Sequence, residues 1–262
     1  MSTKAHCLFA LTALLALSAN ACSASTARVA RSSEAPVQCP GGVIHDDADL
    51  AHFAGCTAVV GDLQIASSRL SDLEGLESIR SVSGALVVAD NPELSELSGL
   101  EQLGSVGRLS IQNNPELSDV SALTKLHMAP VVDVRGNPVL TTLSGLEGLV
   151  QVEKLSLVNN GLFETAGLSH LRQVGELTIA NNPRLISLRG LNGLTRAKSV
   201  EIRNNRLLCA QLGLLPQLGE VSETLVVSAN RSVPQREVAG LFGRVKGAFH
   251  QPGLAARELA LH

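Results

Sequence analysis

The carboxylates of Glu176 and Glu201 are the groups whose type and spacing could support catalysis. They fall on neighbouring copies of a repeat of about 23 residues, at diagonal strand positions that would lie roughly 8 Å apart. Inverting glycosidases hold their two carboxylates roughly 6.5–9.5 Å apart. A flat sheet would give this pair no cleft, and the chain has no Trp or Tyr on which a sugar ring could stack. A carbohydrate-active enzyme is therefore a remote alternative, and we expect no catalytic residue.

A metal site is the second chemistry that the sequence could offer. His45-Asp46-Asp47, with His52 nearby, contains possible ligands. The same stretch fits a short helix over 46–53 that is capped by Asp46 and has an acidic first turn. A zinc site built from cysteines would need closely paired ligands, and Cys-x-x-Cys does not occur. We expect no metal and no cofactor.

An internal repeat dominates the sequence. An apolar residue opens a Leu-x-Ile-like triplet at intervals of 22 to 25 residues, at Leu63, Leu86, Leu109, Val132, Leu155, Leu177, Val200 and Leu225. Five residues later Asn recurs in every coil but the first, where Ser68 stands, at Asn91, Asn114, Asn137, Asn160, Asn182, Asn205 and Asn230. Asn suits a tight bend, and stacked Asn side chains can hydrogen-bond from coil to coil as a structural ladder.

The repeat predicts a mainly β solenoid of seven or eight coils with one parallel sheet along one side. Each triplet directs two apolar side chains to one face of a short strand, and only stacking of coils buries them. A further apolar position follows each Asn, at Leu94, Leu117, Leu140, Phe163, Leu185 and Leu208. Short helices over 46–53 and 234–245 would cover the two ends of the stack.

The N-terminal segment indicates export. Residues 1–21 contain an apolar run that is too short to cross a bilayer as a mature helix, and they are interpreted as a signal peptide. Ala19-Asn20-Ala21-Cys22 fits ordinary signal cleavage and also resembles, in part, a bacterial lipoprotein box in which Cys22 is acylated. Residues 22–38 would be a flexible tether, 39–245 the solenoid with its caps, and 246–262 a C-terminal tail. We expect a membrane-anchored lipoprotein of the cell envelope; a secreted or periplasmic protein is the alternative.

Export makes disulfides plausible. Cys39 and Cys56 are expected to pair, which would join the N-terminal cap to the first coil. Closing a loop of that size would stabilise the fold by roughly 3 kcal/mol. Cys209 has no evident partner.

Two motifs resemble those of the receptor L-domain family. Cys56-Thr-Ala-Val-Val-Gly-Asp-Leu-Gln-Ile65 is similar to the opening of that domain, and Asn204-Asn-Arg-Leu-Leu-Cys209 is similar to its close. The repeats between them also resemble leucine-rich repeats, and the resemblance extends over about residues 39–231. It implies a right-handed β-helix with one main strand per turn, used as a ligand-contact surface. The chain departs from the animal receptors in its unpaired Cys209 and in lacking a kinase or a Cys-rich module, so receptor signalling is not implied.

The outward strand positions provide a candidate binding face, because charge gathers there over coils three to seven. Its members are Arg108, Ser110, Gln112, Asp133, Arg135, Lys154, Glu176, Thr178, Glu201 and Arg203. Lys154 and Glu176 could also simply pair across adjacent coils. We expect a non-catalytic module that binds another envelope or extracellular protein, with a passive structural spacer or coat component as the alternative. A net charge of −3 without a basic patch argues against nucleic acid as a partner.

Overall fold

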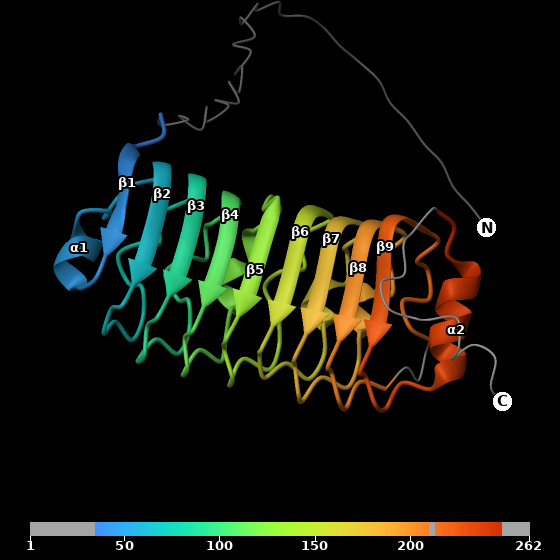
Figure 1. The fold of residues 1–262 in the computed structure, drawn as a ribbon. Helices are drawn as coiled ribbons and strands as arrows, with labels where there is room; N and C mark the ends of the chain where they lie inside the picture. Colours follow the sequence, from blue (N-terminus) through green and yellow to red (C-terminus); the bar gives the residue numbers. More distant parts are fainter. Residues whose placement is uncertain (1–34, 210–212, 248–262) are drawn as a thin grey trace, which may run out of the picture. The chain divides into compact units, whose positions relative to one another are not determined.

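The computed structural model describes residues 35–209 and 213–247, and these form a β-solenoid built on one parallel sheet (Figure 1). The nine strands follow one another in the sheet in chain order. They are β1 (Gln38–Ile44), β2 (Ala58–Ala66), β3 (Ser81–Ala89), β4 (Ser105–Gln112), β5 (Val131–Arg135), β6 (Gln151–Val158), β7 (Gln173–Ala180), β8 (Arg196–Arg203) and β9 (Glu220–Ser228). The predicted signal peptide, Cys22, all but the end of the tether and nearly all of the tail lie outside the described residues.

The register of the sheet reproduces the sequence repeat. Leu63 pairs with Leu86 and Leu86 with Leu109, and the other triplet openers continue the same row to Leu225. The predicted mainly β solenoid is therefore confirmed. β1 is an additional strand that precedes the first expected coil and pairs with β2. The sequence does not predict this strand, because Pro40, Gly41 and Gly42 interrupt the aliphatic pattern.

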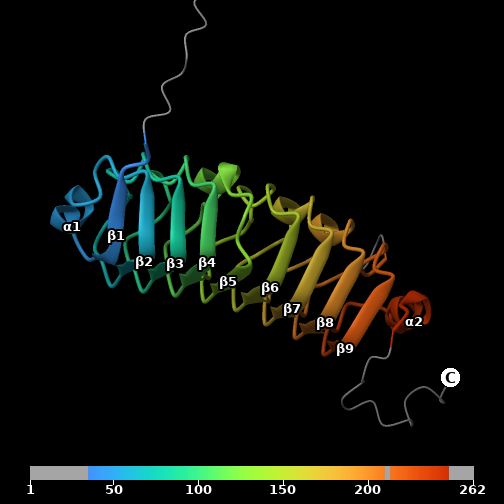
Figure 2. The same ribbon diagram turned by 90° about the horizontal axis from the view of Figure 1, so that it is seen from above.

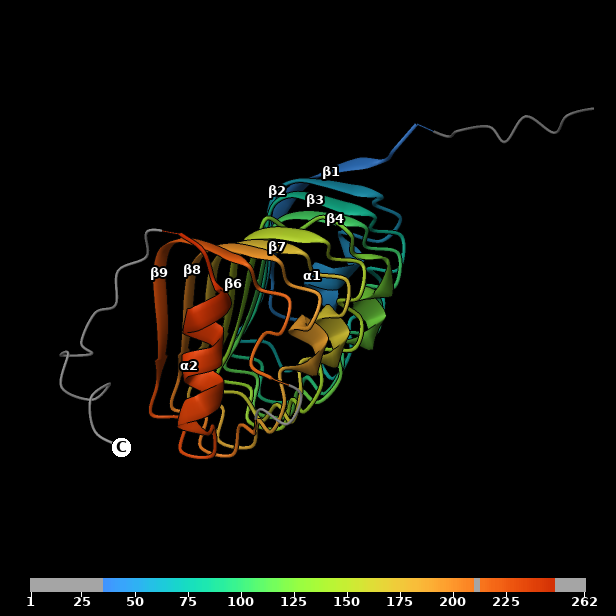
Figure 3. The ribbon, with the colours of Figure 1, turned by 90° about the vertical axis from the view of Figure 1, so that its right-hand side faces the viewer.

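The interior is aliphatic, as the composition predicts. Side chains from the inner face of the sheet meet leucines from the returning half of each coil, and both sets are almost fully buried. Three short 3₁₀-helices lie on that returning side, opposite the sheet (Figure 3): η1 (Ser121–Lys125), η2 (Ala166–Leu168) and η3 (Arg189–Leu191). Because each coil buries its leucines against the coils before and after it, the core is continuous along the stack.

A ladder of buried Asn side chains runs along the turn that follows each strand. The Oδ1 atom of Asn137 accepts hydrogen bonds from the backbone N–H of Asn114 at 3.1 Å and from its amide at 3.3 Å. The Nδ2 atom of Asn137 donates to the carbonyl of Ile111 at 3.1 Å. The same pattern repeats from Asn91 to Asn230, and Ser68 ends the ladder by donating to Asn91. The ladder satisfies backbone groups that a tight, buried bend would otherwise leave unpaired.

One expected core residue is wrong. Phe163 was aligned with the leucines that follow each Asn, but its side chain is 40% exposed while Leu162 is fully buried. This coil has 22 residues, and the missing residue falls between Asn160 and the core leucine. The deletion moves Leu162 into the core position. Phe163 then turns outward, where the guanidinium of Arg184 lies 4.6 Å from its ring centroid.

Helices cover both ends of the stack (Figure 2). At the N-terminal end lies α1 (Asp47–Ala51), whose N-cap Asp46 accepts from the Asp49 N–H at 3.0 Å. The His45 backbone N–H donates to Asp49 and lowers the pKa of that carboxyl. Cys39 and Cys56 form a disulfide with their Cα atoms 5.9 Å apart, which fixes β1 to the loop after α1.

At the C-terminal end lies α2 (Gln235–Arg244). Leu241 is fully buried against the last coil, and Val238 and Phe242 pack beside it. The helix lies within the range 234–245 that the sequence predicts as the C-terminal cap. No helix in the described part of the chain is long and apolar enough to cross a membrane.

Candidate binding face

The candidate binding face lies on the outer side of β4 to β8. Strand alternation turns every second residue away from the core, so the register aligns its members in rows across neighbouring strands. Ser110 is beside Asp133, and Lys154 is beside Glu176. Thr178 is beside Glu201. The sheet therefore presents these ten predicted residues on one continuous surface, at the outward positions expected from the repeat.

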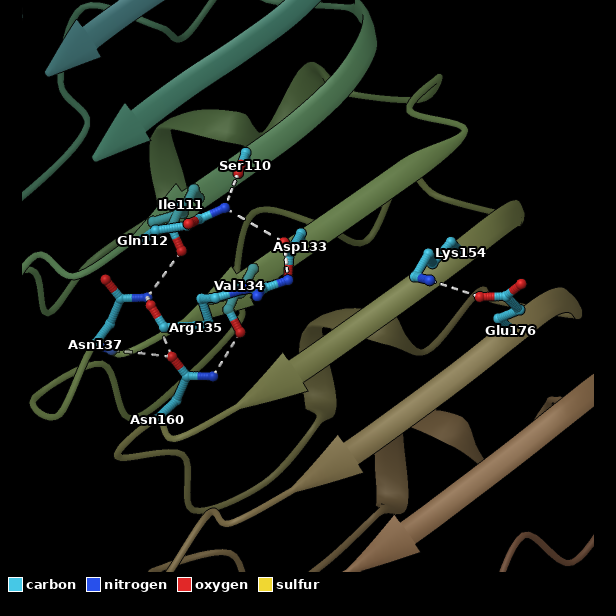
Figure 4. Close-up of polar contacts among 10 residues, drawn as sticks. All are labelled: Ser110, Ile111, Gln112, Asp133, Val134, Arg135, Asn137, Lys154, Asn160 and Glu176. Carbon is cyan, nitrogen blue, oxygen red and sulfur yellow. Dashed lines mark hydrogen bonds and ion pairs between the residues drawn. The ribbon is translucent and has the colours of Figure 1, made fainter. Parts of the chain in front are cut away.

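A hydrogen-bonded cluster fixes the first part of this face (Figure 4). The amide of Gln112 donates to Ser110 Oγ at 2.6 Å and to the carboxylate of Asp133 at 3.4 Å. The guanidinium of Arg135 binds the same carboxylate through two nitrogens, with Nε 2.9 Å from Oδ1. A bidentate contact of this kind holds both partners in one geometry.

Two members of the predicted face are not exposed as expected. Asp133 is 6% exposed and Ser110 is 3% exposed. The long side chains of Gln112 and Arg135 bond to them and cover them. The accessible groups in this region are therefore the outer edges of Gln112 and Arg135, together with Arg108.

Ion pairs fix the second part of the face. Lys154 Nζ lies 2.7 Å from Glu176 Oε2, and both side chains are about half exposed. Within β8, Arg203 lies 3.2 Å from the carboxylate of Glu201. Pairs at such exposure contribute at most about 1 kcal/mol each, so their main effect is to set a pattern of alternating charge. The structure records no ion pair for Arg108, which is exposed on β4.

Sequence reasoning missed a further ion pair beside this face. Arg196 at the start of β8 lies 3.3 Å from Glu220 at the start of β9, and both side chains are well exposed. The two positions are aligned by the register of these strands. Arg196 stands four residues before the triplet opener of its coil, and Glu220 stands five residues before the next one. The repeat spacing alone could therefore have predicted that they lie close together.

The carboxylates of Glu176 and Glu201 do not form an isolated pair. Each bonds a different cation, Lys154 in one case and Arg203 in the other. Two pockets on the described surface, of about 260 and 720 Å³, are lined by other residues. No group of three or more His, Cys, Asp or Glu side chains that could hold a metal ion occurs in the described ranges. Cys209 is a free thiol among the residues that the structure describes.

The comparisons with known proteins agree with the repeat and the opening motif. Residues 55–128 match the family model of the receptor L domain. The matched region begins beside Cys56 and ends before β5 (Val131–Arg135), so it covers the first half of the solenoid. No curated protein matches the chain.

Among solved structures, the chain is similar to the leucine-rich repeat domain of the type III effector XopL. The two are 18% identical with a TM-score of 0.43, and the alignment covers 78% of this chain and 80% of that chain.

Proposed function

We propose that this protein is a non-catalytic, exported binding module whose outer sheet face contacts another protein of the cell envelope or its surroundings. The observation that carries the proposal is the set of polar side chains on β4 to β8, which are held in place by contacts within the face itself. A surface that is ordered before binding loses little conformational entropy when a partner docks. The receptor L-domain match over residues 55–128 supports the same class of function.

The charge pattern restricts the partner to a protein surface of mixed sign. Lys154 and Glu176 place opposite charges side by side, and Arg203 and Glu201 repeat that arrangement two strands further on. A partner of uniform charge would meet repulsion at one member of each pair. Arg108 and Arg135 add exposed guanidinium groups, which are frequent among the residues that dominate protein interfaces.

The test inverts the polarity of each ion pair while keeping the pair itself. Lys154→Glu combined with Glu176→Lys, and Glu201→Arg combined with Arg203→Glu, preserve the internal attraction and reverse what a partner meets. Arg108→Glu removes a cation that has no recorded internal partner. We expect each variant to melt within about 2 °C of the wild type, because surface changes of this kind alter stability by less than about 0.5 kcal/mol.

Crosslinking in cells provides the readout. A photoreactive residue at position 178, in the middle of the face, should capture one partner from cells that produce the wild type. The pair-inverted variants should lose that product, and Arg189→Glu, on the returning side opposite the sheet, should keep it. A crosslink that persists in every inverted variant would show that these charged side chains do not bind the partner.

A passive spacer or coat component is the second candidate function. The continuous core along the stack supports it, because a solenoid of this kind is rigid without a partner. A spacer predicts no specific crosslink from position 178, with the protein still present at its normal abundance. The same experiment therefore separates the two functions.

The envelope location is a proposal about residues outside the described ranges. Mass spectrometry of the mature N-terminus tests it directly. A diacylated or triacylated Cys22 supports a membrane-anchored lipoprotein, whereas an unmodified N-terminus at or near Cys22 supports a secreted or periplasmic protein. Cys22→Ser should release an anchored protein from the membrane fraction.

A further inference from the structure

The two halves of the solenoid carry opposite charge. From residue 35 to 153 there are 16 Asp and Glu against five Lys and Arg, whereas from 154 to 247 there are six against 12. The total of −3 hides this separation. A difference of this size produces a field along the stack that can orient an approaching charged surface.

The separation of acidic from basic residues is also found on one side of the solenoid, which is formed by the segment that follows each buried Asn. Backbone hydrogen bonds connect this segment from coil to coil: Ser118 donates to Ser95, Phe163 to Thr141, and Ile186 to Phe163. We call the exposed surface of these segments the lateral face. Its defining residues are Glu93, Glu96, Glu116, Val139, Phe163, Arg184, Ile186, Arg206 and Leu207.

The acidic part of the lateral face belongs to the early coils and the basic part to the late ones. Glu93, Glu96 and Glu116 are all exposed. Arg184, three coils after Glu116, and Arg206, one coil further, are exposed along the same run of the surface. Glu93, Glu116 and Arg184 occupy the same repeat position, two residues after the ladder Asn.

Apolar side chains separate and flank these charges. Val139 is 38% exposed, Phe163 40%, Ile186 49% and Leu207 53%. In the early coils, Ser95 and Ser118 stand at the positions of Phe163 and Ile186. Glu93 and Glu116 stand at the position of Val139 and Leu207. Large apolar groups combined with arginine are the composition expected of an interface.

We propose that two copies of this chain associate side by side and antiparallel through the lateral face. Val139 lies between the acidic and basic parts, two coils after Glu93 and two coils before Arg184. A two-fold axis beside Val139 therefore places Glu93 of each copy opposite Arg184 of the other. Such an axis satisfies both charge contacts at once and closes the assembly at two chains.

The proposal uses a face other than the candidate binding face. The lateral face is formed by the segment that comes after the strand in each coil, whereas the binding face is the outer side of the sheet itself. Dimerisation would leave β4 to β8 open to a partner and would present two binding faces in one assembly. Failure of either proposal leaves the other standing.

Charge reversal with rescue tests the arrangement. The sample is the full chain carrying Cys22→Ser, which is exported so that its disulfide forms and which cannot carry a lipid on residue 22. Analytical ultracentrifugation should find twice the chain mass at low salt. Glu93→Arg, which sets a cation against Arg184 at both contacts of the two-fold axis, should weaken the dimer at least tenfold, and Arg184→Glu should do the same.

Mixing provides the decisive arm. One acid-reversed copy and one base-reversed copy regain two attractive contacts, so the mixture should form a heterodimer although neither variant dimerises alone. The matched control, Glu223→Arg, makes the same change of charge away from the lateral face and should leave the dimer unchanged.

The position of the axis has its own test. Val139→Cys should give a disulfide-linked dimer under mild oxidation in a Cys209→Ser background. Val150→Cys, in the same coil but outside the lateral face, should not. A monomer at every concentration and salt, an open-ended series of larger masses, or a dimer that ignores both reversals would overturn the proposal.

Discussion

The guanidinium of Arg135 covers the carboxylate of Asp133 two residues earlier on β5, so a charged side chain that is only 6% exposed keeps an ionic partner. Both residues belong to the outer face of the sheet, where the repeat otherwise places exposed side chains. The contact explains why this face combines a polar sequence with limited accessibility. It also makes Arg135 unsuitable as a simple probe of binding, because its loss affects the fold as well.

Removing Arg135 alone should destabilise the protein. Arg135→Ala removes the cation and part of the cover of the Asp133 carboxylate and leaves it the amide of Gln112 at 3.4 Å. We expect a loss of about 1 kcal/mol, well below the value for a fully buried pair, because water then reaches the carboxylate. Adding Asp133→Ser should restore most of the loss, since Ser110 and Ser156 occupy the neighbouring positions. Urea denaturation measures both values; additive losses in the double variant would contradict this account.

Breaking the Asn ladder in its middle should cost more. Asn137→Ala removes the acceptor for the Asn114 N–H and the donor to the Ile111 carbonyl, and each unsatisfied buried group costs about 1–3 kcal/mol. We expect a loss of about 3 kcal/mol or more in thermal and urea unfolding.

The matched control for the ladder is Asn113→Gly. Asn113 lies next to the ladder, is exposed and adopts a positive φ of 53°, and Gly136 occupies the corresponding position of the next coil. Glycine tolerates this conformation, so the change should cost less than about 1 kcal/mol. A cost equal to that of Asn137→Ala would mean that buried hydrogen bonds do not set the ladder's contribution.

The shortened coil predicts a contrast between adjacent residues. Leu162→Ala should destabilise by about 2–5 kcal/mol because it opens a cavity in the continuous core. Phe163→Ala should cost less than about 1 kcal/mol, since its ring is exposed and contacts Arg184. Equal losses, measured by urea denaturation at a concentration where the protein is monomeric, would place Phe163 in the core instead.

Reduction of the Cys39–Cys56 disulfide should loosen one end of the solenoid. The bond closes a separation of 17 residues, and its loss should lower stability by roughly 3 kcal/mol. Cys209→Ser is the appropriate background, because it removes the free thiol. Hydrogen exchange should accelerate in β1 and α1 and stay slow in β6 to β8, since each coil depends chiefly on its neighbours. Equal acceleration of hydrogen exchange in all the strands would contradict a local effect of the disulfide.

Much of the fold was predictable because the same apolar and polar positions recur in eight successive coils. Leu86 and Asn91 each recur at a fixed offset, and neither can be satisfied within one coil. β1 was missed because Gly41 and Gly42 give no aliphatic alternation. Phe163 was misplaced because a repeat register alone does not say where a deletion falls.

The amino-acid sequence by itself determined the period, the aliphatic interior, the turn at each repeated Asn and the separation of charge between the two halves of the chain. Each follows from residue type and spacing, which act locally or between equivalent positions. Only the tertiary structure decided that Asp133 is covered by Arg135 and that Leu162 replaces Phe163 in the core. These depend on which way side chains turn once the coils are stacked, and packing of neighbouring coils sets that direction.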